Sequence, residues 1–310
     1  MKAKVGPWGG GSAFVKSFSR ELESAGFEVC YDLSSGIDVI FLMNPRKGSS
    51  EYSMWSLKRY LKKNPNTKLL FSVIECDKRK NTKEIDKKII KMAKYADHIV
   101  FISDWLKDYF LLKDAFPKTI PHSVIYNGAD STIFNRDGFI PWNGEGKIKI
   151  VTHHWSNNVM KGFDVYEKIG KLLHGELGNY FELTIIGNLP KKFDTQHVKH
   201  VLPLDDIHLA EELHHHHLYI TASRWEPCGM HQLEGGMCGL PIMYIKDGGG
   251  IVDTCKSVGL EFTEDTVVEK LYEMHNHYDE YVKKIEGFDF SAQKTNEEYI
   301  KIINNILSNI

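Results

Sequence analysis

The stretch that decides the fold runs from Leu218 to Asp253 and reads LYITASRWEPCGMHQLEGGMCGLPIMYIKDGGGIVD. Its apolar, β-prone start predicts a strand over residues 218–221, and the following residues 223–227 predict a turn. Residues 229–237 predict a short helix, which a glycine ends. Residues 240–245 then predict a second buried strand, so the stretch alternates strand and helix as α/β sheets do.

Two carboxylates flank the turn in this stretch. Glu226 stands at the mouth of the predicted helix and Glu234 about two helical turns deeper. A rise of about 1.5 Å per residue places them about 12 Å apart at most. At that distance one carboxylate could hold a sugar while the other holds the ribose of a sugar nucleotide. Between them, the free N–H groups of Gly229, Met230 and His231 form a candidate anion site at the helix N-terminus.

The segment Glu226-Pro-Cys-Gly-Met-His-Gln-Leu-Glu234 resembles the signature of retaining GT-B glycosyltransferases, specifically glycosyltransferase family 4. That signature has two glutamates with seven residues between them, and Ser223 and the later Gly-Leu-Pro also fit it. The resemblance implies that Glu226 acts on the donor sugar as a catalytic residue and that Glu234 accepts the ribose hydroxyls. It also implies that the N–H groups of Gly229 and Met230 bind the donor diphosphate. The alternative is structural, with Glu226 as a helix cap and Glu234 as a solvated side chain.

A second motif opens the other half of the chain. Residues 147–153 predict a strand, and the loop after it ends in Lys161 and a glycine. In the resembled family this lysine binds the donor diphosphate together with an upstream arginine, and a fixed ammonium offsets charge on the departing group. Lys161 is therefore a second candidate catalytic residue, with a surface lysine as the alternative. No arginine occupies the upstream loop, so His153, His154 or Arg224 is the candidate substitute.

Three glycines are further candidates for the donor site. Gly10 and Gly11 lie in a predicted turn between an N-terminal strand over residues 2–6 and a helix, an arrangement that can cradle phosphate. The G-x-G-x-x-G fingerprint is absent there, which disfavours nicotinamide and flavin cofactors. A tight turn alone is the alternative. Gly187 ends a predicted strand over residues 181–187, where the resemblance implies the nucleotide base or ribose edge.

Acidic residues follow a buried strand in the first half of the chain. Glu75 and Asp77 come directly after the predicted strand 68–74, at the edge where ligands of open α/β sheets bind. They are candidates for the acceptor side, although relatives carry a histidine or arginine near this position. A surface ion-pair cluster with Lys78 and Arg79 explains them equally well.

The composition limits the partners and the compartment. The 39 Lys and Arg residues nearly balance the 41 Asp and Glu residues, so nothing favours nucleic acid or an acidic membrane. The five cysteines form no C-x-x-C pair, which indicates reduced thiols and a cytoplasmic protein. No apolar run reaches the roughly 18 residues of a membrane span, and no signal peptide is recognised. Peripheral membrane contact stays open because an acceptor could be lipid-linked.

Repeated strand–helix units predict two doubly wound, Rossmann-like α/β domains facing across a cleft, the GT-B fold. The expected boundaries are residues 1–129 for the acceptor-side domain, 130–146 for a linker and 147–290 for the nucleotide-sugar domain. A terminal helix over residues 291–310 is expected to return to the first domain. Four consecutive histidines, His214 to His217, cannot all face one ion, so no metal site is expected.

The sequence thus predicts a retaining, metal-independent glycosyltransferase of the hexosyltransferase type, without a cofactor. It would move a sugar from a UDP-, GDP- or ADP-sugar to a hydroxyl of a glycan, lipid-linked or small-molecule acceptor. The base, the sugar, the acceptor, the oligomeric state and the pathway are left open. Two other classes stay in view: a sugar-nucleotide epimerase of GT-B architecture, and a non-catalytic subunit that binds nucleotide sugars or glycans.

Overall fold

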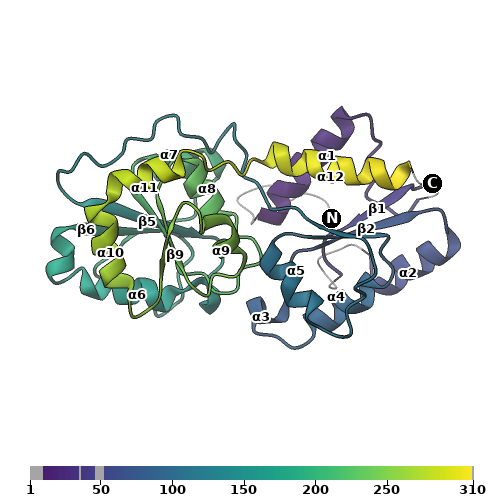
Figure 1. Cartoon of the computed structure of the whole chain (residues 1–310), viewed down its shortest axis with the longest axis horizontal. Helices are drawn as coiled ribbons and strands as arrows, with labels where there is room; N and C mark the ends of the chain where they lie inside the picture. Colours follow the sequence, from purple (N-terminus) through teal and green to yellow (C-terminus); the bar gives the residue numbers. More distant parts are fainter. Residues whose placement is uncertain (1–9, 35, 46–51, 309–310) are drawn as a thin grey trace. The chain divides into compact units, whose positions relative to one another are not determined.

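A computed structural model describes residues 10–34, 36–45 and 52–308 (Figure 1). The predicted N-terminal strand over residues 2–6 lies outside the described residues. The chain forms two compact units. The first contains the described residues of 10–127 together with 292–308, and the second contains residues 128–291. The segment 130–146, expected to be a linker, lies with the second unit.

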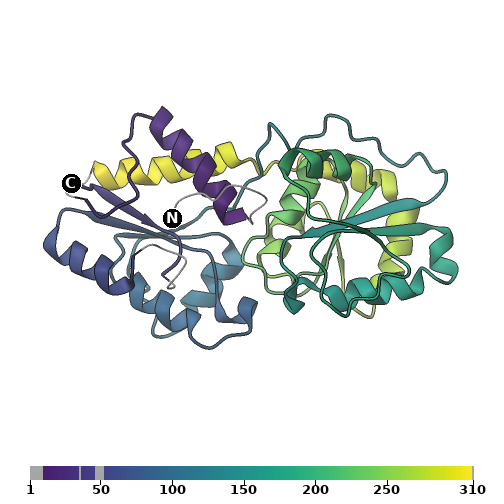
Figure 2. The same ribbon diagram turned by 180° about the vertical axis from the view of Figure 1, so that it is seen from behind.

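The first unit is built on a parallel sheet of four described strands in the order β1-β2-β3-β4. These strands are Val39–Leu42, Lys68–Val73, His98–Phe101 and His122–Val124. Because each strand pairs with its successor, right-handed crossovers place the connecting helices on one face. These helices are α2 (Met54–Lys63), α4 (Ile85–Ala93) and α5 (Asp104–Leu111), and the short α3 (Asp77–Lys80) precedes α4. Helices α1 (Gly10–Ser24) and α12 (Ala292–Leu307) cover the other face (Figures 1 and 2).

The start of α1 differs from the prediction at its glycines. Gly10 and Gly11 form the first turn of the helix and not a loop before it. The sequence suggested a loop because glycine is unfavourable within helices. The amphipathic helix that follows, with Val15 and Phe18 buried, extends back through both glycines.

The last helix completes the core of the first unit. Tyr299 on α12 is buried, and its ring lies 5.3–5.5 Å from the ring centroids of Phe14, Phe18 and Phe41. Its hydroxyl forms a buried hydrogen bond of 2.8 Å with the hydroxyl of Ser72 on β2. One side chain from near the end of the chain thus joins α1, β1 and β2.

We expect Tyr299→Ala to destabilise the protein by about 3–5 kcal/mol, the usual cost of removing a buried aromatic ring. Urea unfolding followed by circular dichroism measures this change. Lys301→Ala, which changes an exposed residue of the same helix, is the control and should leave the free energy of unfolding nearly unchanged. Equal midpoints for the two variants would contradict the role assigned to Tyr299.

The second unit is built on a parallel sheet of six strands in the order β10-β9-β8-β5-β6-β7. The strands are Ile148–His154 (β5), Phe181–Gly187 (β6), Lys199–Val201 (β7), Leu218–Thr221 (β8), Ile242–Ile245 (β9) and Leu260–Phe262 (β10). The chain runs outward from β5 to β7 and then returns to β8 on the other side of β5. This reversal creates a topological switch point at the carboxyl ends of β5 and β8.

Helices and short 3-10 turns connect the strands of the second unit. In chain order they are η1 (Val159–Lys161), α6 (Phe163–Leu172), η2 (Glu176–Asn179), α7 (Asp206–His214), α8 (His231–Met237), α9 (Gly250–Cys255), α10 (Val267–Asn276) and α11 (Tyr278–Ile285). Every residue of strand β5 except Lys149 is buried, so the strand is covered on both faces. Among the helices that the structure describes, none combines the length and apolar character needed to cross a bilayer.

The run of four histidines separates into different environments. His214 contacts the carbonyl of Asn135 through Nε2 at 2.8 Å, and His216 contacts the carbonyl of Glu212 through Nδ1 at 2.8 Å. His217 accepts a hydrogen bond from the backbone N–H of Lys149. Burial lowers the pKa of His216 to about 4. The histidines therefore cap and join elements of the fold and do not converge on one point.

Candidate active site

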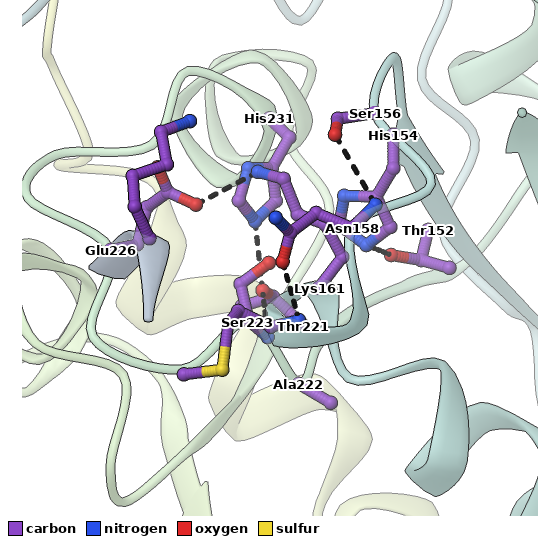
Figure 3. A network of polar contacts seen from close by, with 12 residues as sticks. Thr152, His154, Ser156, Asn158, Lys161, Thr221, Ala222, Ser223, Glu226 and His231 are labelled. Carbon is purple, nitrogen blue, oxygen red and sulfur yellow. Dashed lines mark hydrogen bonds and ion pairs between the residues drawn. The ribbon is translucent and has the colours of Figure 1, made fainter. Parts of the chain in front are cut away.

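The candidate site lies at the switch point of the second unit. Two loops meet there: residues 155–162 follow β5, and residues 222–230 follow β8. Figure 3 shows side chains from both loops directed toward one another, with Lys161 and His231 between them. Parallel α/β sheets bind ligands at such carboxyl ends, because the connections after the two neighbouring strands lead to opposite sides of the sheet.

An ion pair joins the two loops. The ammonium of Lys161 donates to Oε2 of Glu226 over 2.8 Å, and the two side chains are only 12% and 14% exposed. The residues are 65 positions apart in the chain. A charge pair with so little solvent is screened weakly, so its geometry strongly influences any charge that develops beside it.

Glycine permits the close approach of the two loops. Gly162 has a φ of +80°, and a Cβ there would lie 2.2 Å from the carbonyl oxygen of Ala222. The N–H of Arg224 also donates to the carbonyl of Met160 at 2.8 Å. The Lys-Gly pair of the sequence motif therefore has a packing reason: the glycine lets the lysine reach Glu226.

The backbone of Glu226 is held by the glycine-rich turn after β9. Its N–H donates to the carbonyl of Gly248 at 3.0 Å, and its carbonyl accepts from the N–H of Gly250 at 2.8 Å. Gly249 has a φ of +69°, and a Cβ there would lie 2.9 Å from the Glu226 carbonyl oxygen. The preceding Trp225 has a φ of +54°, a strained value for a bulky residue.

Because Gly249 has both a positive φ and a close neighbour, we expect Gly249→Ala to destabilise the protein by about 1–3 kcal/mol. The substitution should also displace Glu226 and lower activity. Thermal unfolding and a turnover assay measure the two effects. Gly287→Ala is the matched control, since a Cβ there has no atom within 4 Å. If both variants behaved alike, the proposed support of Glu226 would be wrong.

The second glutamate of the motif is held by a histidine. Oε2 of Glu234 lies 2.7 Å from Nε2 of His153, at the end of β5. Nδ1 of His153 lies 3.1 Å from the hydroxyl of Tyr219, which also accepts from the backbone N–H of His153. Burial raises the pKa of the Tyr219 hydroxyl well above its ordinary value, so the hydroxyl keeps its proton. Tyr219 can therefore donate to Nδ1 while Nε2–H donates to Glu234.

The neighbouring His154 is oriented differently. It is buried, and its Nε2 lies 2.9 Å from the hydroxyl of Tyr166. Burial first, and then the charges of His231, Lys161 and His153, hold the pKa of His154 well below its ordinary value of 6.5. His154 is therefore neutral at physiological pH and supplies no positive charge in place of the missing arginine.

Arg224 is already engaged by carboxylates. Its guanidinium donates to both oxygens of Asp164, at 2.9 and 2.7 Å, and also contacts Glu264. The hydrogen bonds that Arg224 donates to Asp164 raise the pKa of Arg224, burial opposes this, and Glu264 raises it further. A diphosphate could use this guanidinium only in exchange for these contacts. Lys161 thus remains the cation in contact with a motif glutamate.

Helix α8 begins later than the sequence suggested. It starts at His231 and ends at Met237, so Gly229 and Met230 precede the helix and do not form its first turn. Its first backbone hydrogen bond runs from the N–H of Glu234 to the carbonyl of Met230, at 2.8 Å. The predicted start followed Pro227, which favours a first helical turn, but the segment 222–230 packs as an irregular loop.

Buried polar atoms without partners border the same loop. Among the described residues, Oγ of Ser223 and both amide atoms of Gln232 are fully buried and have no hydrogen-bond partner. Most buried polar atoms in proteins are satisfied by protein or water, so such a cluster indicates a place where a polar ligand or water binds. From the sequence, neither residue was assigned a role in the site, although Ser223 fits the family signature. Gln232 lies between the two motif glutamates and Ser223 just before the first, and that position was the available signal.

Gly187 lies beside a shallow surface depression. A Cβ at this residue, which has a φ of +119°, would lie 2.0 Å from the carbonyl oxygen of His154, so close strand packing accounts for the glycine. The depression of about 400 Å³ adjoins the carboxyl ends of β5 and β6. It is lined by Trp155, Ser156, Asn157, Asn188 and Leu189. The ring of Trp155, 42% exposed, offers a flat surface there.

The remaining candidate residues, Glu75 and Asp77, belong to the first unit, which also contains Gly10 and Gly11. The carboxylate of Asp77 accepts the backbone N–H groups of Ile85 and Asp86, at 2.9 and 3.1 Å. Burial alone would raise the pKa of Asp77, but these bonds and one from Thr82 lower it. Glu75 is buried and contacts Lys80 at 3.2 Å. Both acidic side chains thus have structural partners.

In the described part of the chain, no three His, Cys, Asp or Glu side chains are grouped so that they could hold a metal ion.

The contact between His153 and Glu234 was not predicted from the sequence. Both residues were candidates, but only the pairing of β5 with β8 shows that they meet.

No protein-family model matches the chain, and no curated protein sequence matches it. Its fold, however, is similar to those of solved glycosyltransferases. A sucrose-phosphate synthase from Thermosynechococcus elongatus matches with a TM-score of 0.67 and 13% identity, over 96% of this chain and 78% of that one. A glycosyltransferase from Rickettsia africae matches with a TM-score of 0.65 and 15% identity, over 100% of this chain and 85% of that one.

A third similar structure is the Anabaena protein HepE in complex with UDP and glucose. It matches with a TM-score of 0.63 and 12% identity, over 93% of this chain and 80% of that one. At such identities the likeness concerns the fold. The chain therefore has the two-sheet α/β fold of GT-B glycosyltransferases, as the sequence predicted.

Proposed function

We propose that the protein is a glycosyltransferase that moves a sugar from a nucleoside diphosphate sugar to a hydroxyl, with retention of configuration and without a metal. The observation that carries the proposal is the Lys161–Glu226 pair at the switch point of the second unit. A cation and a carboxylate held 2.8 Å apart in a poorly solvated site can stabilise the negative and the positive charge that develop in one transition state.

Each member of the pair would stabilise one of the two charges that develop during transfer. Glycosyl transfer builds positive charge on the sugar and negative charge on the departing diphosphate. Glu226 would contact the donor-sugar hydroxyls and stabilise the oxocarbenium-like centre, while Lys161 would stabilise the diphosphate. In the ion pair each charge neutralises the other. No side chain is assigned as the general base, since the donor phosphate itself can accept the acceptor proton.

The rest of the donor would extend across the same sheet edge. Glu234, held by His153, would accept the two ribose hydroxyls. The N–H groups of Gly229 and Met230 would bind the diphosphate from the irregular loop before α8. The depression beside Gly187 would receive the base, with Trp155 as a stacking surface. In the first unit, Glu75 and Asp77 stay candidates for binding the acceptor. Gly10 and Gly11 stay candidates for binding the donor.

A thermal-shift panel with UDP, GDP, ADP and their sugars in EDTA tests the donor class. A ligand at 100 times its dissociation constant stabilises the native state by about 2.7 kcal/mol, which is visible as a higher melting temperature. Stabilisation by one nucleotide in EDTA supports the proposal. If no nucleotide raises the melting temperature, the proposed donor site is wrong.

We expect Glu234→Ala to weaken nucleotide binding while the fold stays intact. Hydrogen bonds to a charged acceptor contribute about 1.5–3 kcal/mol, so affinity should fall roughly tenfold to hundredfold. Titration calorimetry measures the affinity, and circular dichroism checks the fold. Glu182→Ala, at an exposed position of β6, is the control. Unchanged affinity in Glu234→Ala would remove the ribose assignment.

Lys161→Met should lower kcat by about 10²–10³, the usual effect of removing one transition-state hydrogen-bond donor. Product formation from donor and acceptor is followed by chromatography. Lys171→Met changes an exposed lysine of α6 and should leave kcat unchanged. A fall in affinity for donor with kcat preserved would argue against a catalytic role for Lys161.

Two product analyses separate the proposal from its alternatives. Nuclear magnetic resonance of the product gives the anomeric configuration, and retention preserves that of the donor. Incubation with donor alone identifies an epimerase, because it would release a changed sugar nucleotide without any acceptor. Nucleotide-sugar binding with no turnover under either condition would favour a binding subunit.

A further inference from the structure

A concentration of positive charge covers one face of the first unit. Residues 52–94 contain thirteen Lys and Arg residues and four Asp and Glu residues. Two of the four acidic residues, Glu75 and Asp86, are buried. The overall charge of −2 therefore conceals a strongly basic local surface.

The basic residues follow two helices that lie side by side on the same face of the sheet (Figures 1 and 2). We define the basic face as the half-buried Lys58 and the exposed Arg59, Lys62, Lys63, Lys87, Lys88, Lys91 and Lys94. Helix α2 carries no acidic residue. The exposed acid at the start of α4, Glu84, pairs with Lys87 at 2.9 Å.

Two aromatic side chains are exposed within this face. Trp55 on α2 is 67% exposed, and Tyr95 after α4 is 46% exposed. The guanidinium of Arg59 lies 5.2 Å from the ring centroid of Trp55, and the ammonium of Lys58 lies 4.3 Å from that of Tyr95. The second contact links α2 to the end of α4, so the charges and rings form one continuous surface.

We propose that the basic face binds the surface of a bilayer that contains anionic lipids. Clusters of four to eight or so basic residues are attracted to anionic leaflets, and each contributes separately near the surface. Tryptophan and tyrosine prefer the headgroup level, where one edge of the ring is apolar and the other is wet. Lysine stems can lie along the same level with their ammonium groups among the phosphates.

The composition of the face favours lipid over nucleic acid. Lysine supplies every charge of the face except that of Arg59. Lysine acts as a point charge, whereas planar, bidentate phosphate recognition uses arginine. Scattered lysines beside an exposed tryptophan are typical of surfaces that bind anionic lipid. Proteins that bind single-stranded nucleic acid instead stack the bases on aromatic rings in a positively charged groove.

The protein is tested by co-sedimentation with vesicles of phosphatidylcholine alone and of phosphatidylcholine mixed with phosphatidylglycerol. We expect binding to the mixed vesicles only, with an affinity that falls as salt rises. Each charge near the surface changes affinity roughly fivefold. The variant Arg59→Glu, Lys62→Glu, Lys91→Glu should therefore bind more than about a hundredfold more weakly.

A matched variant with Lys147→Glu, Lys256→Glu and Lys283→Glu makes the same charge change on exposed lysines of the second unit. It should keep its vesicle binding. Trp55→Ala should weaken binding severalfold with the salt dependence unchanged, because it removes interfacial contact and no charge. None of these residues belongs to the proposed donor site, so the result is independent of the proposed function.

Three results would overturn the proposal. The first is the absence of binding to mixed vesicles at low salt. The second is an equal loss of binding in the two triple variants, which would indicate attraction by overall charge. The third is tight binding of poly(U) RNA that the basic-face variant loses, with mixed vesicles left unbound, because that would assign the face to nucleic acid.

Discussion

The reversal of strand order between β5 and β8 is the constraint on which the candidate site depends. The chain leaves β5 toward β6 and β7, and later returns to place β8 on the opposite side. The loops after these two strands therefore lie next to each other at one edge of the sheet. Lys161 comes from one loop and Glu226 from the other, so the ion pair between them is a product of topology. Gly162 and Gly249 then allow the close backbone contacts that this meeting requires.

The electrostatics of the site follow from how its charges are shared. Arg224 is engaged by Asp164 and Glu264, and His154 is buried and neutral. That leaves Lys161 opposite Glu226, with His153 directed at Glu234. Within the Lys161–Glu226 pair the two charges cancel, and a ligand that inserts between them separates them. Such an arrangement suits a reaction in which opposite charges develop on two parts of one substrate.

Local patterns predicted much of the fold. The strands around the glutamate motif, observed at Leu218–Thr221 and Ile242–Ile245, were evident from their apolar runs. The start of α8 was wrong by two residues, because the packing of a loop outweighed the preference of Pro227. The pairing of His153 with Glu234 was out of reach, since it depends on which strands are neighbours and not on spacing. The basic face was hidden for a similar reason: a net charge says nothing about where the charges lie.

Because helix α12 belongs to the first unit but follows the second unit in the chain, the two units can complete their folding at different times during synthesis. All residues of the second unit described here, 128–291, leave the ribosome before Tyr299 does. The second unit can therefore complete its sheet and core first, as domains generally fold as units. The aromatic cluster of the first unit must wait, with Phe14, Phe18 and Phe41 lacking their partner ring until the last helix arrives. The first unit thus begins before the second unit along the chain and is completed after it.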